Sequence, residues 1–238
     1  MSVLLALGAG HAHADDGDVI SAERPGFSSS PVALKPSVMQ IEAGYEYVRA
    51  GNSIDAHALP LTLFRYGIAD EFELQLGWAG YAWVNGSGQD INGIRDASIG
   101  MKWQVSDEDA ALPLALFAGV SLPIGDDDFT SDEVDPTIGA FWSFDAGLSW
   151  FGTVLVSDVA GSRTVGNAVG ISLPIDDRSG GYVEYFGIFA EGNGPEHYVN
   201  GGIAYLPRNN VQVDLHLGAG VNDRAADLFV GAGIAYRF

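Results

Sequence analysis

Apolar and polar residues alternate with a period of two from Ser37 to the end of the chain. The alternating segments are about ten residues long and are separated by Gly, Pro, Asn and Asp, which favour turns. This pattern predicts β-strands with one face in apolar surroundings, and no stretch shows helical periodicity. Twelve strands are predicted, at residues 37–48, 56–66, 71–83, 94–105, 112–122, 136–144, 148–157, 165–173, 181–190, 197–206, 211–221 and 227–238.

The two faces of the predicted strands differ in chemistry. The stretch VQVDLHLG at 211–218 places Val and Leu on one face, and Gln, Asp, His and Gly on the other. Arg65 is the one charge on an apolar face, in a strand of ambiguous register, and we expect it to extend toward a membrane interface. Short connections such as 67–70 and 207–210 predict antiparallel hairpins.

Alternation alone fits both a soluble sandwich and a membrane barrel, and three features favour the barrel. The polar face is rich in Gly, Ala and Ser, which suits a confined lumen. Connections on one side reach 84–93 and 123–135, whereas those on the other side are shorter. Aromatic residues on the apolar face gather at strand ends, as interfacial girdles do: Phe72, Trp103, Trp142, Phe144, Trp150, Tyr205, Tyr236 and Phe238 at one rim, and Tyr45, Tyr47, Trp78 and Phe189 toward the other.

The sequence therefore predicts an all-β fold, a transmembrane antiparallel up-and-down barrel of about 12 strands in the outer membrane of a Gram-negative bacterium. Because twelve is even, both termini fall on the side of the shorter connections, which is the periplasmic side in such barrels. Lipid does not tolerate an unpaired strand edge, so the last strand must pair with the first. Tyr236 and Phe238 would then complete the lipid-facing row of the closing strand.

The residues before the barrel divide into two parts. Residues 1–14 have an apolar stretch and an A-x-A site but no basic start, and they predict the remnant of a cleaved signal peptide. Residues 15–36 would form a periplasmic segment, and the barrel would span 37–238. This segment either folds back as a plug, with Arg24 reaching an inward carboxylate, or is a loose tail. The longest uncharged run, 110–125, is shorter than the ~20 residues of a spanning helix and contains prolines.

The charge and composition of the chain exclude several classes of binding partner. The formal net charge of −20 argues against nucleic acid, because phosphates would be repelled. The absence of cysteine excludes a disulfide-stapled scaffold. The five histidines lack metal-ligand spacing, and no glycine-rich phosphate loop occurs, so neither metal nor cofactor is predicted. The acidic loop GDDDFTSDEVD (125–135) lacks the order of an EF-hand; we expect a solvated external loop, or one bridged by divalent cations to lipopolysaccharide.

Several stretches resemble one family of outer-membrane transporters. They are ERPGFSSSP (23–31), QIEAGYEY (40–47), LFRYGIADEFELQLG (63–77), IRDASIGMKW (94–103), SLPIG (121–125), VQVDLHLGAGV (211–221) and FVGAGIAYRF (229–238). The resemblance is to the family labelled putative meta-pathway of phenol degradation, although its first motif more often begins with Asp where this chain has Glu23. The family name implies uptake of an aromatic compound. The final Phe also resembles the signal that the barrel-insertion machinery recognises.

The alternation assigns side chains to the lumen. Twelve tilted strands give a backbone diameter of roughly 25 Å and a lumen on the order of 10 Å, wide enough for a small solute. The polar residues predicted to line it are Glu42, Glu46, Glu73, Gln75, Asp96, Lys102, Glu184, Asn200, Asp214, His216, Asp227 and Arg237. The aromatic ones are Tyr81, Phe117, Phe141, Phe151, Tyr182, Phe186, Tyr198 and Phe229. The rings either suit a partly apolar ligand or simply fill a narrow barrel, and the charges form either networks or a substrate path.

Three classes of function remain. The sequence favours a channel for passive or facilitated diffusion of a small, aromatic or hydrophobic solute. A closed structural barrel shares every feature of the fold. A lipid hydrolase needs a Ser, His and carboxylate together on the outer face, where His197 is the single candidate and has no Ser in a nucleophile motif beside it, so no enzyme is predicted.

Overall fold

The computed structural model describes residues 19–51, 54–86, 88 and 90–238. These residues form fourteen β-strand segments: β1 (Met39–Ala50), β2 (Ile54–Ala69), β3 (Phe72–Trp78), β4 (Tyr81–Asn85), β5 (Ile91–Ile94), β6 (Ala97–Gln104), β7 (Leu114–Leu122), β8 (Asp135–Asp145), β9 (Ser149–Val159), β10 (Ser162–Asp176), β11 (Ser179–Ala190), β12 (Glu196–Arg208), β13 (Val211–Gly220) and β14 (Leu228–Arg237). The predicted signal peptide at 1–14 lies outside the described residues. No helix of the described residues is long and apolar enough to cross a bilayer.

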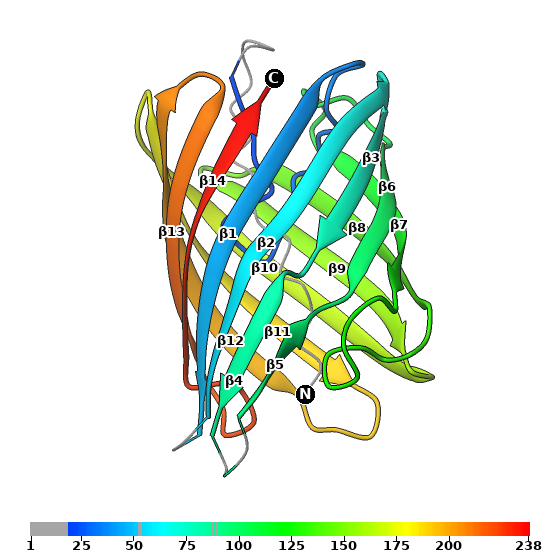
Figure 1. Cartoon of the computed structure of the whole chain (residues 1–238). Coiled ribbons are helices and arrows are strands. Elements are labelled where there is room, and N and C mark those ends of the chain that lie inside the picture. The colour runs from blue at the N-terminus through cyan, green and yellow to red at the C-terminus, as the bar shows by residue number, and fades with distance from the viewer. Residues whose placement is uncertain (1–18, 52–53, 87, 89) are drawn as a thin grey trace.

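The sheet closes on itself as a tilted barrel (Figure 1). β1 pairs antiparallel with β2 on one side and with β14 on the other, in register from Gln40–Arg237 to Arg49–Leu228. The backbone N–H of Phe238 donates to the carbonyl of Met39 at 3.0 Å, so the pairing continues to the last residue. The predicted pairing of the first and last strands is confirmed.

Two of the barrel strands are interrupted. β2 pairs with β3 and then, farther along, with β4, while β6 pairs with β3 and β5 with β4. β3 with β4, and β5 with β6, therefore each complete one barrel strand, and the fourteen segments make a barrel of twelve. The predicted twelve-stranded antiparallel barrel is confirmed.

The interruptions lie in one irregular row that crosses three neighbouring strands. In β2 the pairing with β1 shifts by one residue at Leu59–Pro60, which is a β-bulge. The row continues through Ala79–Gly80 and Arg95, where the N–H of Arg95 donates to the carbonyl of Gly80 at 2.9 Å. Gly80 has φ +76°, a conformation that glycine adopts without strain.

This row reverses the alternation of inward and outward residues and corrects two predictions. Arg65 lies beyond the bulge and is 1% exposed inside the barrel, rather than near the lipid interface. Tyr81 lies beyond Gly80 and faces outward, where its ring contacts Trp83 at 4.7 Å between centroids. Side chains normally alternate between the two faces along a strand. One extra residue moves every following side chain to the opposite face, so an assignment made from one end of such a strand is wrong at the other end.

We call the end of the barrel with Met39 and Phe238 the terminal end, and the opposite end the distal end. The outward rings predicted for the terminal rim are in place, and they contact one another in the pairs Phe72–Trp103, Trp142–Phe144, Phe144–Trp150 and Tyr236–Phe238. The longest distal connection is 123–134, but the terminal end also carries a long one at 105–113, so the two ends differ less than the sequence suggested.

Residues 19–34 lie inside the barrel near the terminal end, where the dark-blue trace in Figure 1 runs behind β1 and β2, and the exposed residues 35–37 connect them to β1; together they form the segment 19–38. We call this segment the plug. Its side chains at Ile20, Glu23, Phe27 and Ser28 are all buried. The barrel is therefore partly filled by its own N-terminal segment.

Candidate functional site

The lumen is the candidate site, and most of the residues predicted to line it are buried there. The polar members with at most 7% exposure are Glu42, Glu73, Gln75, Lys102, Glu184, Asn200, Asp214 and His216. The ring members with at most 8% exposure are Phe141, Phe151, Tyr182, Phe186, Tyr198 and Phe229. Glu46, Asp96, Phe117 and Arg237 are half-buried, and Asp227 is exposed just before β14.

The plug enters and leaves at the terminal end. On the inbound leg, the N–H of Ile20 donates to the carbonyl of Asn209, in the turn between β12 and β13, at 2.6 Å. The chain then runs from the terminal end toward the middle of the barrel, where it turns back at Phe27–Ser29; we call this turn the apex. On the return leg, the N–H groups of Ala33 and Leu34 donate to Gln104 and Glu73, and Ser37 donates to the carbonyl of Gly67.

Carboxylates of the wall hold the plug by its backbone. Glu42 accepts the N–H of Glu23 with both oxygens at 3.0 Å and that of Arg24 at 3.1 Å. Glu184 accepts the N–H groups of Phe27 and Ser28 and the hydroxyl of Ser28 at 3.0 Å. A segment without secondary structure leaves its backbone donors unpaired, and these wall residues satisfy them. Three of the inward carboxylates, those of Glu42, Glu73 and Glu184, are therefore hydrogen-bonded to the plug backbone.

A buried cluster of five charges joins the plug to the wall. Arg65 contacts Glu23, Glu42 and Glu73 at 2.9, 3.2 and 2.8 Å, and Lys102 contacts Glu23 and, at 4.0 Å, Glu73. Each of these side chains is at most 1% exposed. Three carboxylates face two cations, and Gln40 and Gln75 donate further hydrogen bonds to Glu42 and Glu73. The predicted network of lumen charges therefore exists, and it is centred on Arg65, which the sequence placed outside.

The side chain of Arg24 in the plug packs against two glycines of the barrel wall, Gly44 and Gly233. Its guanidinium donates to Asp214 at 3.2 Å, which confirms the expected contact with an inward carboxylate. A Cβ at Gly44 would come within 2.3 Å of this guanidinium, and one at Gly233 within 2.1 Å of its Nε. Gly44 and Gly233 are paired on neighbouring strands. The small residues that suggested a lumen are here the residues that make room for the plug.

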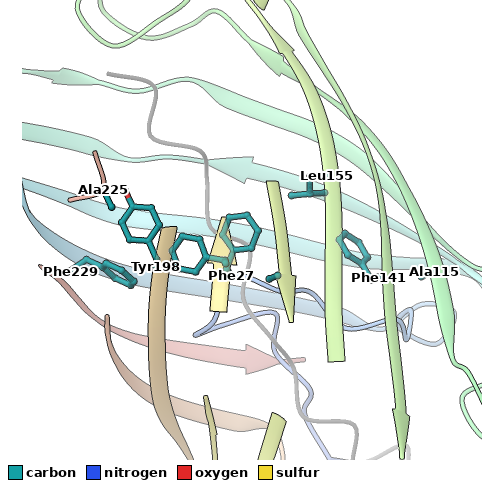
Figure 2. Close-up of a cluster of buried hydrophobic side chains, with 9 residues drawn as sticks. Phe27, Ala115, Phe141, Leu155, Tyr198, Ala225 and Phe229 are labelled. Atoms are coloured by element: carbon teal, nitrogen blue, oxygen red, sulfur yellow. The ribbon is translucent and has the colours of Figure 1, made fainter. Parts of the chain in front are cut away.

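An aromatic layer crosses the lumen at the apex of the plug. Phe27 packs with Phe141, Phe186, Tyr198 and Phe229 from the wall, together with Leu155 and three alanines. Figure 2 shows Phe27 between Tyr198 on one side and Leu155 and Phe141 on the other. Phe117 packs against this cluster, while Phe151 contacts Tyr182 in a separate pair. Five of the predicted lumen rings, those of Phe117, Phe141, Phe186, Tyr198 and Phe229, therefore meet around Phe27.

A chamber of about 830 Å³ opens on the distal side of this layer. Its walls are mostly apolar and small, with Ala56, Ala58, Ala82 and Ala97 among them, and Phe117 and Leu155 belong both to the chamber and to the aromatic layer. The polar groups are fewer: Glu46, His57, Arg95, Asp96, Asp128, Asp135 and several hydroxyls. A mostly apolar cavity with a few polar groups has the character of a site for a small organic molecule.

The acidic loop forms part of the chamber wall. Asp126 donates its N–H to the carbonyl of Ile94 at 2.9 Å, and its carboxylate accepts the N–H of Ile94 at 2.8 Å. Asp96 accepts the N–H of Gly125 at 2.9 Å. The pairings of the described residues join β5 only to β4, so Asp126 substitutes for a strand at the other edge of β5. The prediction of a merely solvated loop is wrong for residues 125 and 126.

The described residues do not form a metal site, and His197 lies outside the lumen. Among the described residues, no group of His, Asp and Glu is arranged to hold a metal ion. The ring of His197 lies on the outer face, where its Nδ1 is 2.6 Å from the hydroxyl of Tyr185 and its ring contacts Phe189. Glu23, Gln40 and Thr153 contact the plug or belong to it, and the sequence did not single them out. The parity of their strands would have marked Gln40 and Thr153, whereas Glu23 lies outside any strand and carries no such signal.

Comparison with known proteins agrees with this geometry. A sequence model of the family described as "Putative MetA-pathway of phenol degradation" matches residues 22–238. The chain belongs to this family. The match begins within the plug, so the family model covers most of the plug as well as the barrel.

Several solved structures share the barrel fold of this chain. The COG4313 outer membrane channel from Pseudomonas putida F1 is 11% identical, with 87% of this chain and 97% of that chain covered and a TM-score of 0.66. The NanC porin is 10% identical over 83% and 98% of the two chains, with a TM-score of 0.57. The KdgM porin, solved in complex with disordered oligogalacturonate, is 12% identical over 84% and 99%, also at 0.57.

At these identities the likeness establishes the fold, that of outer-membrane channels and porins. No protein with a curated description matches the chain.

Proposed function

We propose that this protein is an outer-membrane channel that admits a small, neutral, apolar or aromatic solute by passive or facilitated diffusion, without catalysis. The distal chamber carries the proposal. It is large enough for a molecule of one or two rings, half of its lining residues are alanine, valine, isoleucine or phenylalanine, and it lies on the distal side of the aromatic layer. The family description and the channel fold of the solved relatives support the same function.

The proposal can be tested with a variant in which large side chains fill the chamber. Ala56→Trp with Ala82→Trp places two large rings from neighbouring strands into it, since both alanines line the chamber. We expect uptake of radiolabelled toluene by a Gram-negative host to rise with the wild-type protein and to fall to the empty-vector level with the filled variant. The matched control is Ile234→Trp, which adds the same ring to the lipid-facing side of β14, where Ile234 is 49% exposed.

Each outcome decides between classes of function. Uptake at the wild-type level by the filled variant would show that solute does not pass through the chamber. Uptake no higher with the wild-type protein than with empty vector would favour a closed structural barrel. Hydrolysis of phospholipid by the purified protein, abolished in His197→Ala, would favour the lipid hydrolase.

The proposal places the terminal end in the periplasm and the distal end toward lipopolysaccharide. Tyr236 and Phe238, both exposed on the lipid-facing side, would be read by the barrel-insertion machinery during assembly. The chain contains no cysteine, so single cysteines report the orientation. On intact cells a membrane-impermeant maleimide should label Asp132→Cys and should reach Asp177→Cys only after the outer membrane is permeabilised. The reverse pattern would overturn the orientation.

A further inference from the structure

Three rings form a parallel stack in the lumen, and the plug contributes one of them. Phe27 lies 4.7 Å from Phe186 with an angle of 5° between the ring planes, and Phe186 lies 4.7 Å from Tyr198 at 17°. Phe186 on β11 and Tyr198 on β12 are fixed as direct neighbours by strand pairing. Phe27 belongs to no strand, and it is 2% exposed. The wall thus presents a flat ring surface that is covered by a ring from a segment outside the sheet.

The stack lies beside the chamber. Phe117 and Leu155 line the chamber and also pack with the cluster that contains Phe27. Figure 2 shows Leu155 and Phe27 facing each other across the middle of the barrel. The chamber and the cluster that contains the stack therefore share these two side chains.

The apex is attached by few hydrogen bonds, all from the plug to side chains of the wall. Phe27 and Ser28 donate to Glu184, and the N–H of Ser29 donates to Thr153 at 3.3 Å. The legs of the plug, in contrast, carry the charge cluster of Glu23 and the contacts with Glu42 and Glu73. Displacement of the apex therefore requires these four hydrogen bonds to rearrange, but it breaks none of the ion pairs of the legs.

We propose that Phe27 occupies a binding site for one aromatic ring of a solute, so that a solute ring displaces Phe27 and opens the aromatic layer. The inference rests on the proposed function, because the solute must first enter the chamber. An incoming ring gains the same stacking on Phe186 that Phe27 gives up. A ligand that binds only when Phe27 is displaced shifts the plug toward its open form.

The same site should bind neutral aromatic rings in preference to anionic ones. The carboxylate of Glu184 is 1% exposed and accepts the N–H of Phe27, so it lies next to the position of this ring. An anionic ring would meet this carboxylate at close range in a buried environment, where like charges repel strongly. Neutral rings are therefore the ligand class, and aromatic carboxylates are excluded.

The test measures equilibrium binding of radiolabelled phenol and benzoate to the full chain in nanodiscs, with protein-free nanodiscs as the blank. Phe27→Ala removes the competing ring, and we expect phenol to bind about tenfold more tightly than to the wild-type protein, because the site no longer has to be vacated. Phe151→Ala is the matched control, since Phe151 is also a buried lumen ring but packs with Tyr182 outside the stack. This control should bind phenol as the wild type does, and benzoate should bind to none of the proteins.

The possible results separate this inference from the proposed function. Saturable phenol binding that is equal in wild type and Phe27→Ala would overturn the inference while leaving the chamber as a binding site. Benzoate binding as tight as phenol binding would overturn the charge selection. Absence of saturable binding in every variant would count against both proposals. If Phe27→Ala fails to give the heat-modifiable band of a folded barrel, Phe27→Leu decides, with an expected affinity between those of wild type and Phe27→Ala.

Discussion

At the scale of single residues, Arg65 has the greatest number of charged partners among the described residues. Its guanidinium contacts carboxylates from β1, from β3 and from the plug, all within 3.2 Å. Burial of so many charges costs desolvation energy, which is offset only while every charge keeps its partners. One residue therefore couples the plug to the wall, and its removal leaves Glu23, Glu42 and Glu73 facing Lys102 alone.

We predict that Arg65→Met lowers the free energy of unfolding by about 3–5 kcal/mol, because carboxylates would remain buried without their main partner. Urea unfolding in detergent micelles, followed by tryptophan fluorescence, measures this change. The control is Arg49→Met, whose partner Asp55 lies at the exposed end of β1 and β2, where solvent screens the ion pair, so this substitution should change the stability much less. Equal effects of the two substitutions would contradict the role of Arg65.

At the scale of elements, the irregular row decides where the barrel is filled and where it is hollow. On the terminal side of the row, β1, β2 and β3 present charged and amide side chains to the plug. On the distal side, β2, β4 and β5 present small residues to the chamber. The reversal of faces at Pro60 and Gly80 places Leu61 and Ala58 alike toward the interior, and it moves Tyr81 and Trp83 outward.

We predict that Gly80→Ala destabilises the barrel more than an ordinary glycine substitution in a turn. At φ +76° a Cβ costs about 1–2 kcal/mol, and here it would also lie 2.5 Å from the carbonyl oxygen of Pro60. Gly88→Ala is a control with a similar φ of +86° and no atom within 4 Å of the added Cβ. The midpoints of urea unfolding of the two variants should differ, and coinciding midpoints would show that the close approach at Gly80 has no energetic consequence.

The wall elements were largely predictable from alternation, and the plug contacts were not. The parity of β11 and β13 correctly assigned Glu184, Asp214 and His216 to the interior, because these strands are regular over their whole length. Parity failed for Arg65 and Tyr81, which lie beyond the irregular row. The role of Glu184 as a backbone acceptor for the plug joins residues 157 positions apart, and no local pattern carries that information.

At the scale of the whole molecule, the barrel is closed by β14 and its terminal half is filled by residues 19–38. The aromatic layer ends this filling, and the chamber begins beyond it. We therefore expect passage of a solute through the lumen to require that the plug moves or leaves.

We predict that deletion of residues 15–34 raises the single-channel conductance in planar bilayers, because it frees the terminal half of the lumen. The deletion also removes the backbone donors of Glu42, Glu73 and Glu184, and the enlarged lumen should therefore favour cations in reversal-potential measurements. The variant must first show the heat-modifiable mobility of a folded barrel. Unchanged conductance in a folded deletion variant would rule out the plug as the barrier.

The sequence by itself determined the number of barrel strands, the chemistry of their two faces and the closure of the last strand on the first. These features follow from local alternation and from the rule that lipid leaves no backbone edge unpaired. Only the tertiary structure decided the row that reverses the faces, the path of the plug and the division of the lumen into a filled half and a chamber. An extra residue in a strand is invisible to a period of two, and contacts such as Glu23 with Lys102 form only when the barrel brings distant residues together.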